Sequence, residues 1–406
     1  MRALDDILVL DLSRVLAGPW CTQMLADLGA DVIKVEKPGE GDDTRGWGPP
    51  FLTDPETGER GDAAYYLSAN RGKRSITVDI STPQGQDILR QLAAKADVVV
   101  ENYKQGGLKK YGLDYDALKQ VNPRLVYCSI TGFGQTGPYA PRAGYDFMIQ
   151  AMGGLMSITG ERDDLPGGGP QKAGIAVADL VTGLHAVIAV QAALMQRHRT
   201  GLGQHIDMAL LDVQVSVLAN QAMTYLVSGA VPGRAGNGHA AIVPYQSVPT
   251  ADGYLIIAVG NDGQFAKLAE ELGQPHWATD ERFATNRARV VNRATLIPLI
   301  EDQTRRFTSE ALLAVLEARQ IPCGPINTID KVFEDPQVQA RTIRRDVPHP
   351  LTGTLPTVAS PLRLSDSEVI YDRGPPLLGQ HTGEVLSQLL GLEPQAIEAL
   401  HQAGVV

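Results

Sequence analysis

The chain has 406 residues, 43% hydrophobic and 20% charged, so it can bury a large core and we expect about two domains. Its formal net charge of −10 argues against a surface built to bind nucleic acid or an anionic membrane. Its few cysteines, Cys21, Cys128 and Cys323, have no metal-ligand spacing, and no secretory or transit segment opens the sequence, so we expect a cytoplasmic protein.

The first third of the chain alternates between short apolar segments and amphipathic ones. Strands are expected at residues 7–12, 31–36, 74–80, 97–101 and 125–131, and helices at residues 19–27, 82–95 and 115–120. Such alternation predicts a doubly wound α/β domain with a parallel sheet. The loop at residues 37–60 is long for a connection, which favours a functional role.

A long apolar helix is expected over residues 173–201, followed by a second over about 210–227. Apolar residues occupy all faces of the first helix, which predicts that most of it is buried. Asp179 interrupts the apolar run near its start, so no membrane span is predicted. Because an unpaired buried carboxylate is costly, Asp179 either caps the first turn or faces a cleft as a nucleophile. The local sequence alone favours the cap.

The texture of the sequence changes after the glycine-rich stretch at residues 228–238, which we interpret as a domain boundary. A hairpin is expected over residues 248–259, with its turn at 251–253, followed by helices at 264–272, 295–304 and 309–318. These elements predict a smaller α+β domain. The domains expected are therefore residues 1–227, 228–325 and 326–406, the last being punctuated by prolines.

The run from Gly132 to Gly137 fits the pattern G-x-G-x-x-G that binds dinucleotides. However, Pro138 and Pro141 stand where a helix should begin, and no acidic residue ends a second strand about twenty residues later. We therefore predict a glycine-permitted turn. A set of basic residues falls at strand ends or in adjoining loops, where it either holds a phosphate or lies on a solvated surface. The set is Lys34, Lys37, Arg71, Lys73 and Arg74.

Motifs in order along almost the whole chain resemble those of the family III CoA-transferases (CaiB/BaiF type). They are residues 10–19, 28–36, 70–75, 100–102, 132–134, 145–146, 178–179 with Gly183, 321–325 and 376–382. The family's nucleophilic aspartate matches Asp179, which overturns the capping interpretation. The resemblance implies a Rossmann-like large domain to which residues 326–406 return, and an interlocked homodimer. It also implies acyl-CoA and a carboxylic acid as substrates, without a metal or redox cofactor.

The resemblance also assigns a path for CoA. The nucleotide end is expected at Lys37, Val78, Asp79 and Ile80. The phosphate and pantetheine portion is expected at Asn102, Tyr103 and Lys110, and the thioester at Leu16, Ala17, Ala143, Gly144 and Tyr145. The glycine-rich loop that contains Gly236 and Gly238 is expected to act as a flap beside the substrate.

Residues 42–51, 142–146 and 238–246 look most similar to family members that transfer CoA from succinyl-CoA to a dicarboxylate such as glutarate. The second carboxylate of such a substrate needs a cation, and Arg14 and Arg45 are the candidates, each with a structural ion pair as the alternative. Leu16 stands where formyl-CoA transferases carry glutamine, which argues against oxalate.

Three alternatives remain beside this reading: a racemase of α-methylacyl-CoA, a formyl-CoA- or carnitine-type transferase, and a CoA-binding protein without catalytic activity. The family's racemases carry a histidine base where this chain has Tyr145. A phenol is a poor base at neutral pH, which counts against racemisation. A carboxylate within an apolar helix counts against a protein that only binds CoA.

Overall fold

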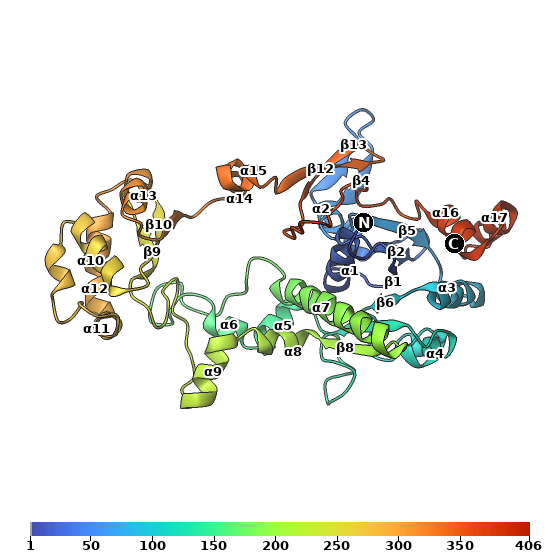
Figure 1. Cartoon of the computed structure of the whole chain (residues 1–406), viewed down its shortest axis with the longest axis horizontal. Coiled ribbons are helices and arrows are strands. Elements are labelled where there is room, and N and C mark those ends of the chain that lie inside the picture. Colours follow the sequence, from blue (N-terminus) through green and yellow to red (C-terminus); the bar gives the residue numbers. More distant parts are fainter. Residues whose placement is uncertain (1) are drawn as a thin grey trace. The chain divides into compact units, whose positions relative to one another are not determined.

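The computed structural model describes residues 2–406, which form two compact units (Figure 1). The larger unit holds the described residues up to Leu155 together with Ala173–Met223 and Gln337–Val406, and the smaller unit holds Met156–Lys172 and Thr224–Pro336. These limits differ from the domains expected from the sequence. The smaller unit takes a segment from the middle of the expected large domain, and it extends eleven residues or so further toward the C-terminus.

A six-stranded parallel sheet organises the larger unit, with the strand order β5-β2-β1-β6-β7-β8. Its strands are β1 (Leu8–Asp11), β2 (Asp31–Glu36), β5 (Lys73–Thr77), β6 (Val98–Glu101), β7 (Val126–Thr131) and β8 (His205–Ala209). The strand order reverses between β1 and β6, which opens a crevice at their carboxyl ends. The predicted parallel α/β architecture is therefore confirmed, although β8 was not predicted because its alternating, half-buried residues follow directly on a long helix.

Helices cover both faces of this sheet because successive strand residues point to opposite sides. Leu10 and Ile33 pack in one core with α3, α4, α16 and α17, whereas Val9 and Val32 pack in the other with α1 and α7 (Figure 1). The helices of this unit are α1 (Ala17–Asp27), η1 (Asp43–Gly46), α2 (Ala64–Leu67), α3 (Pro83–Lys95), η2 (Lys109–Tyr111), α4 (Tyr115–Val121), α5 (Asp146–Met152), α7 (Val177–Thr200), α8 (Leu210–Ser216), α16 (Thr382–Leu390) and α17 (Pro394–Gln402).

The start of α3 illustrates how local sequence sets these elements. The side chain of Thr82 accepts a hydrogen bond from the N–H of Gly85, and Pro83 occupies the first helical position, where a missing N–H costs nothing. Two hairpins complete the larger unit. They are formed by β3 (Phe51–Thr53) with β4 (Arg60–Ala63), and by β12 (Arg344–His349) with β13 (Gly353–Val358).

The prediction that most of α7 is buried was wrong. Ala186 and Val190 belong to a buried stripe that packs on the sheet, but Leu184, Ile188 and Met195 are 39%, 62% and 69% exposed. By length and hydropathy alone α7 would suffice to cross a membrane, but the core helices of soluble proteins often meet the same criteria. The second expected helix is also interrupted, giving α8 and α9 (Ala219–Ser228), because the backbone turns to a positive φ of 46° at Ala219.

The smaller unit is an α+β arrangement around an antiparallel sheet of order β11-β10-β9. Its strands are β9 (Tyr245–Pro249), β10 (Tyr254–Ala258) and β11 (Cys323–Pro325). Leu255 and Ile257 of β10 are fully buried against Phe265, Leu296 and Leu312. Its helices, with two that flank its limits, are α6 (Leu155–Ile158), α10 (Asp262–Glu271), η3 (Pro275–Ala278), α11 (Asn286–Val291), α12 (Arg293–Thr304), α13 (Ser309–Ala318), α14 (Ile329–Glu334) and α15 (Pro336–Ala340).

Candidate active site

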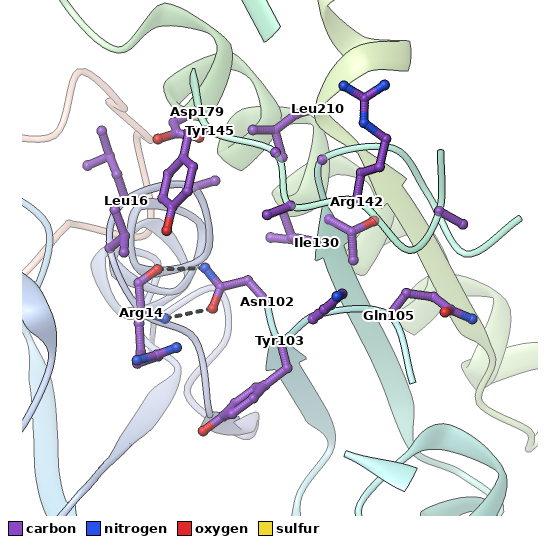
Figure 2. A pocket seen from close by; sticks show the side chains of 18 residues that line it. Arg14, Leu16, Asn102, Tyr103, Gln105, Ile130, Arg142, Tyr145, Asp179 and Leu210 are labelled. Carbon is purple, nitrogen blue, oxygen red and sulfur yellow. Dashed lines mark hydrogen bonds between the residues drawn. The ribbon is translucent and has the colours of Figure 1, made fainter. Parts of the chain in front are cut away.

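A pocket of about 240 Å³ lies at the carboxyl ends of β1, β6 and β7, beside the point where the strand order reverses (Figure 2). Parallel sheets of this kind bind their ligands at such a place. The pocket brings together many of the residues expected from the sequence to contact the substrates. They are Arg14, Leu16, Ala17, Asn102, Tyr103, Ala143, Gly144, Tyr145 and Asp179.

Asp179 lies in the first turn of α7 but does not cap it. Asp146 does so instead: its Oδ1 accepts hydrogen bonds from the N–H of Ala178 at 2.8 Å and from the N–H of Asp179 at 3.3 Å. Among residues 2–406, no hydrogen bond or ion pair engages the Asp179 carboxylate. Burial, and then the nearby charge of Asp146, raise the pKa of Asp179 to about 7. Its carboxylate is therefore free to face a ligand.

Two close backbone approaches shape the pocket, and each requires glycine. A Cβ at Gly183 would lie 2.8 Å from the carbonyl oxygen of Ala17, so the absence of a side chain lets α7 approach the start of α1. Likewise, a Cβ at Gly132 would lie 2.5 Å from the Cα of Gly144. The G-x-G-x-x-G run therefore forms part of the pocket wall by permitting this crossing.

The pocket contains two arginines with free hydrogen-bonding capacity. The Nη1 atom of Arg14 contacts Asp43 at 3.0 Å, but this side chain is about half exposed and keeps its other donors. Arg142 packs over the rings of Phe133 and Tyr139, and within residues 2–406 it has no ion pair. Arg142 was not identified from the sequence. It lies in a stretch already noted for its resemblance, and only its position in the pocket lining identifies it as a candidate cation (Figure 2).

The expectation that Arg45 binds substrate was wrong. Arg45 is 9% exposed and lies outside the pocket. Its guanidinium pairs with Glu36 and Asp62, each at 2.7 Å, and also donates to the Tyr66 hydroxyl and the Pro376 carbonyl. Every nitrogen of its guanidinium therefore donates a hydrogen bond within the protein, and Arg45 forms a structural ion pair, which was the alternative to substrate binding.

Most basic residues at the strand ends also form ion pairs inside the protein. Lys34 pairs with Asp42 at 2.8 Å and Lys73 with Asp11 at 3.1 Å, and all four side chains are fully buried. Arg71 pairs with Asp27, and Arg74 with Asp31 and Glu384. These four residues are thus neither phosphate ligands nor solvated surface groups. Lys37 differs, because its side chain is 59% exposed and contacts only Glu40 among the ion pairs of residues 2–406.

The remaining residues expected to bind CoA lie outside this pocket. Lys37 follows β2, and Val78, Asp79 and Ile80 follow β5, so these residues share the carboxyl edge of the sheet with the pocket. Lys110 lies in η2, after β6. Gly236 and Gly238 belong to the smaller unit, in which Arg234 ties their loop to Glu161 and Asp163.

Comparison with known proteins places this geometry in a family. The model of "CoA-transferase family III" matches residues 4–382. The chain is 55% identical over 393 residues to a succinate–glutarate CoA-transferase of Agrobacterium fabrum, covering 97% of each chain. It is 44% identical to a succinyl-CoA:glutarate CoA-transferase of Mus musculus, covering all of this chain and 91% of the other.

A solved structure agrees with these sequence matches. The crystal structure of a CaiB/BaiF family protein from Brucella suis superposes with a TM-score of 0.86 at 55% identity, covering 96% of this chain and all of the other. The parallel sheet with its crevice, and a family match over more than nine-tenths of the chain, lead to one assignment. The chain belongs to the family III CoA-transferases.

Proposed function

We propose that this enzyme transfers CoA from succinyl-CoA to glutarate, with Asp179 as the nucleophile. The observation that carries the proposal is the unpaired Asp179 carboxylate in the first turn of an apolar helix, inside a pocket that Arg14 and Arg142 also line. Relatives named for succinyl-CoA and glutarate support the choice of substrates, at 44% and 55% identity over nearly their full lengths.

The first half of the reaction moves CoA from succinate to the enzyme. The Asp179 carboxylate attacks the thioester carbonyl of succinyl-CoA, the C–S bond breaks, and the CoA thiolate leaves a mixed anhydride between Asp179 and succinate. The thiolate then attacks the aspartyl carbonyl of the anhydride. Free succinate departs and an aspartyl-CoA thioester remains. Covalent catalysis thus divides one difficult exchange into steps of similar energy.

The second half repeats these steps in reverse order with the new acid. A carboxylate of glutarate attacks the aspartyl carbonyl, which expels the CoA thiolate and gives a mixed anhydride between Asp179 and glutarate. The thiolate attacks the glutaryl carbonyl, so that glutaryl-CoA leaves and the Asp179 carboxylate is regenerated. No cofactor besides the CoA ester takes part in the proposed sequence.

The walls of the pocket suit these intermediates. Leu16, Ile130, Ala140 and Leu210 present apolar side chains, which limit the water that would hydrolyse an anhydride. The same apolar setting disfavours the charged form of Asp179 and makes it a stronger base and nucleophile than an ordinary aspartate. Arg14 or Arg142 supplies the positive charge that recognises the carboxylate of glutarate that does not react.

The alternative functions have less support. Racemisation needs a proton acceptor on each face of the α-carbon, and beside Asp179 the pocket offers Tyr145, a residue that is 67% exposed and whose phenol is a poor base at neutral pH. Transfer from formyl-CoA to oxalate is disfavoured by Leu16, which provides no polar group at the pocket wall. A protein that only binds CoA would have no use for an unpaired, destabilising carboxylate at this position.

We further propose that the chain functions as a homodimer of the interlocked kind that the family resemblance implies. Leu184, Ile188 and Met195 form an exposed apolar stripe along α7, and Leu226 and Val227 of α9 are 71% and 80% exposed. Contiguous exposed apolar side chains such as these favour burial against another chain. We propose that a second copy of this chain covers these residues, because the family resemblance, which implies a homodimer, extends over nearly the whole chain.

The experiment that tests the proposed activity is an acceptor panel. Purified enzyme is incubated with succinyl-CoA and one free acid at a time, including glutarate, oxalate, butyrate and carnitine, and the CoA esters are read by mass spectrometry. Glutaryl-CoA formation at the highest rate is expected. Transfer to another acid but not to glutarate would refute the substrate assignment, and loss of chirality at the α-carbon of an added 2-methylacyl-CoA would instead favour racemisation.

A further inference from the structure

The turn that leads into the pocket has an unusual backbone. Val15 lies between β1 and α1 with φ of 71°, in the left-handed region. A side chain that branches at Cβ is disfavoured there, and glycine is the usual residue in that conformation. Val15 lines the pocket together with the next two residues, Leu16 and Ala17, and Asp179 lines the same pocket. The strained residue is thus itself part of one wall of the active site.

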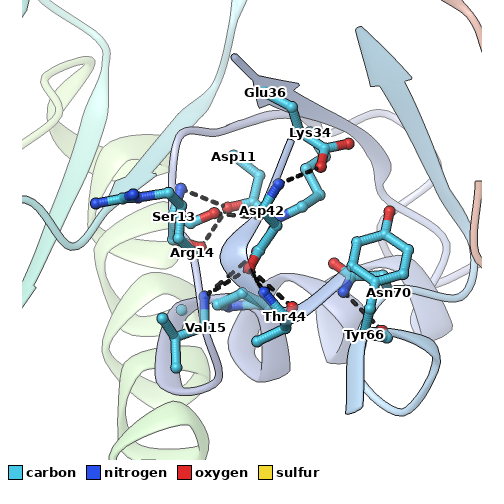
Figure 3. Close-up of polar contacts among 12 residues, drawn as sticks. Asp11, Ser13, Arg14, Val15, Lys34, Glu36, Asp42, Thr44, Tyr66 and Asn70 are labelled. Atoms are coloured by element: carbon cyan, nitrogen blue, oxygen red, sulfur yellow. Dashed lines mark hydrogen bonds and ion pairs between the residues drawn. The ribbon is translucent and has the colours of Figure 1, made fainter. Parts of the chain in front are cut away.

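Side chains from other parts of the chain hold this turn. The N–H of Val15 donates to both carboxylate oxygens of Asp42, at 3.2 and 3.3 Å (Figure 3). The neighbouring residue is held as well, since Asn102 accepts from the N–H of Arg14 at 2.8 Å and donates to its carbonyl oxygen at 2.6 Å (Figure 2). The strained conformation is therefore fixed by long-range contacts and not by its local sequence.

Asp42 is in turn held by Lys34. Its Oδ2 accepts from the Nζ of Lys34 at 2.8 Å, and its Oδ1 accepts from the backbone N–H and the hydroxyl of Thr44 at 3.0 and 2.8 Å. Lys34 also donates to the carbonyl oxygen of Ser13 at 3.0 Å, which is the residue before the turn. Burial opposes ionisation, but Lys34 and the Thr44 donors outweigh it and hold the pKa of Asp42 at about 2. The charged acceptor is therefore present at every pH at which the enzyme would work.

We infer that the buried Lys34–Asp42 pair is a positioning element for CoA transfer, which holds Val15 in the left-handed conformation and thereby sets the Leu16–Ala17 wall against Asp179. The inference rests on the proposed function. Neither Lys34 nor Asp42 lines the pocket, so the pair acts through the turn and not on the substrate. Without Asp42, valine would relax toward a negative φ and carry the wall with it. A small displacement of a reacting group costs a large factor in rate.

The test compares Asp42→Asn with the same change combined with Val15→Gly. Asp42→Asn should lower kcat about ten- to a hundredfold while the KM for succinyl-CoA stays within about threefold, because the turn orients the reacting end and most of CoA binds elsewhere. Glycine adopts a positive φ without support, so Val15→Gly should restore most of the lost kcat. The acceptor is the acid that gives the highest wild-type rate in the panel, so this outcome does not depend on glutarate being that acid.

A matched control separates positioning from stability. Asp27 forms a similarly buried ion pair, with Arg71, away from the pocket. Asp27→Asn should lower the melting temperature and leave kcat unchanged. If Asp42→Asn leaves Lys34 too poorly paired to fold, Asp42→Glu keeps the charge but displaces the oxygens, and the same loss and rescue are expected. A folded Asp42 variant with wild-type kcat overturns the inference, as does a loss of kcat that Val15→Gly fails to restore.

Discussion

The backbone N–H of Asp179 donates to the Oδ1 atom of Asp146 at 3.3 Å, so two aspartates meet at the first turn of α7. Asp146 performs the capping that the local sequence suggested for Asp179, and it does so from the start of another helix, α5. The contact has two consequences. It leaves the Asp179 carboxylate without a partner, and it brings a second negative charge close enough to raise the pKa of Asp179.

The charge of Asp146 should add to the effect of burial in setting the acid limb of the pH–rate profile. In Asp146→Asn the amide oxygen can still accept from the N–H of Ala178, but the like charge is gone. The pKa of Asp179 should fall, because its ionised form is no longer repelled, and the acid limb of kcat/KM should move to lower pH. Profiles of the wild type, of Asp146→Asn and of the surface control Asp87→Asn would check this. A limb that stays in place or moves to higher pH contradicts the prediction.

Asp179 should also reduce the stability of the fold at alkaline pH. Its pKa is about 7 in the folded state against 3.8 as the unperturbed value, so the native state binds the proton more tightly than the unfolded state. The destabilisation therefore grows as pH rises from about 4 to 7 and then levels off. Asp179→Asn should melt at a higher temperature than the wild type at pH 8 and at about the same temperature at pH 4. An equal difference at both pH values would exclude this linkage.

The parallel sheet could be predicted because strands such as β2 and helices such as α3 have clear signals in their own residues. The apolar residues of Asp31–Glu36 predict a buried strand, and Thr82 followed by Pro83 predicts the start of a helix. The sequence pattern of α7 was less informative. An apolar helix looks the same whether a face packs on the protein's own sheet or remains exposed, as Ile188 does.

The candidate site was predicted as far as the family motifs reach, and no further. Nine residues of the pocket wall were named from the sequence, but Arg45, which lies outside the pocket, was named with them and Arg142 was missed. An arginine that faces a pocket and one that pairs with Glu36 carry no different local signal. Contacts between distant segments decide which arginine is available to a ligand, and such a contact also fixes Val15, whose N–H donates to Asp42.

Replacing the nucleophile should separate binding from chemistry. Asp179→Ala removes the group that forms the anhydride, and loss of a covalent nucleophile should cost several orders of magnitude in rate. Succinyl-CoA should still bind, because we expect its CoA portion to contact other residues, and calorimetry would measure this. The variant should also fail to accumulate a covalent CoA adduct that the wild type shows by mass spectrometry of the intact protein. Transfer at a tenth of the wild-type rate would rule Asp179 out as the nucleophile.

The exposed stripe of α7 should be covered in solution. We expect light scattering to give a single species of about twice 43.5 kDa at dilute concentration, in line with a dimer that does not dissociate readily. Ile188→Asp would place a charge in the stripe and should reduce the dimer or prevent its assembly, whereas an exposed change on α3, Gln91→Asp, should not. An active, monodisperse species of about 43.5 kDa would show that the dimer is wrong.

The arginines of the pocket should determine selectivity for a dicarboxylate. One carboxylate of the acceptor reacts with Asp179, so only the distal carboxylate is available to a fixed cation. A contact between arginine and a carboxylate is worth about 1.5–3 kcal/mol, or roughly ten- to a hundredfold in discrimination. Arg14→Leu or Arg142→Leu should therefore raise the KM for glutarate far more than that for butyrate, with the smaller effect at Arg14 because it already contacts Asp43. Arg90→Leu, on the surface of α3, is the matched control and should change neither value.

Arg45→Leu should instead lower the melting temperature without favouring either acid, because it breaks a buried ion pair. If neither pocket variant changes the preference for glutarate over butyrate, the distal carboxylate is recognised elsewhere, and if the wild type uses butyrate as well as glutarate, the dicarboxylate assignment fails while CoA transfer stands.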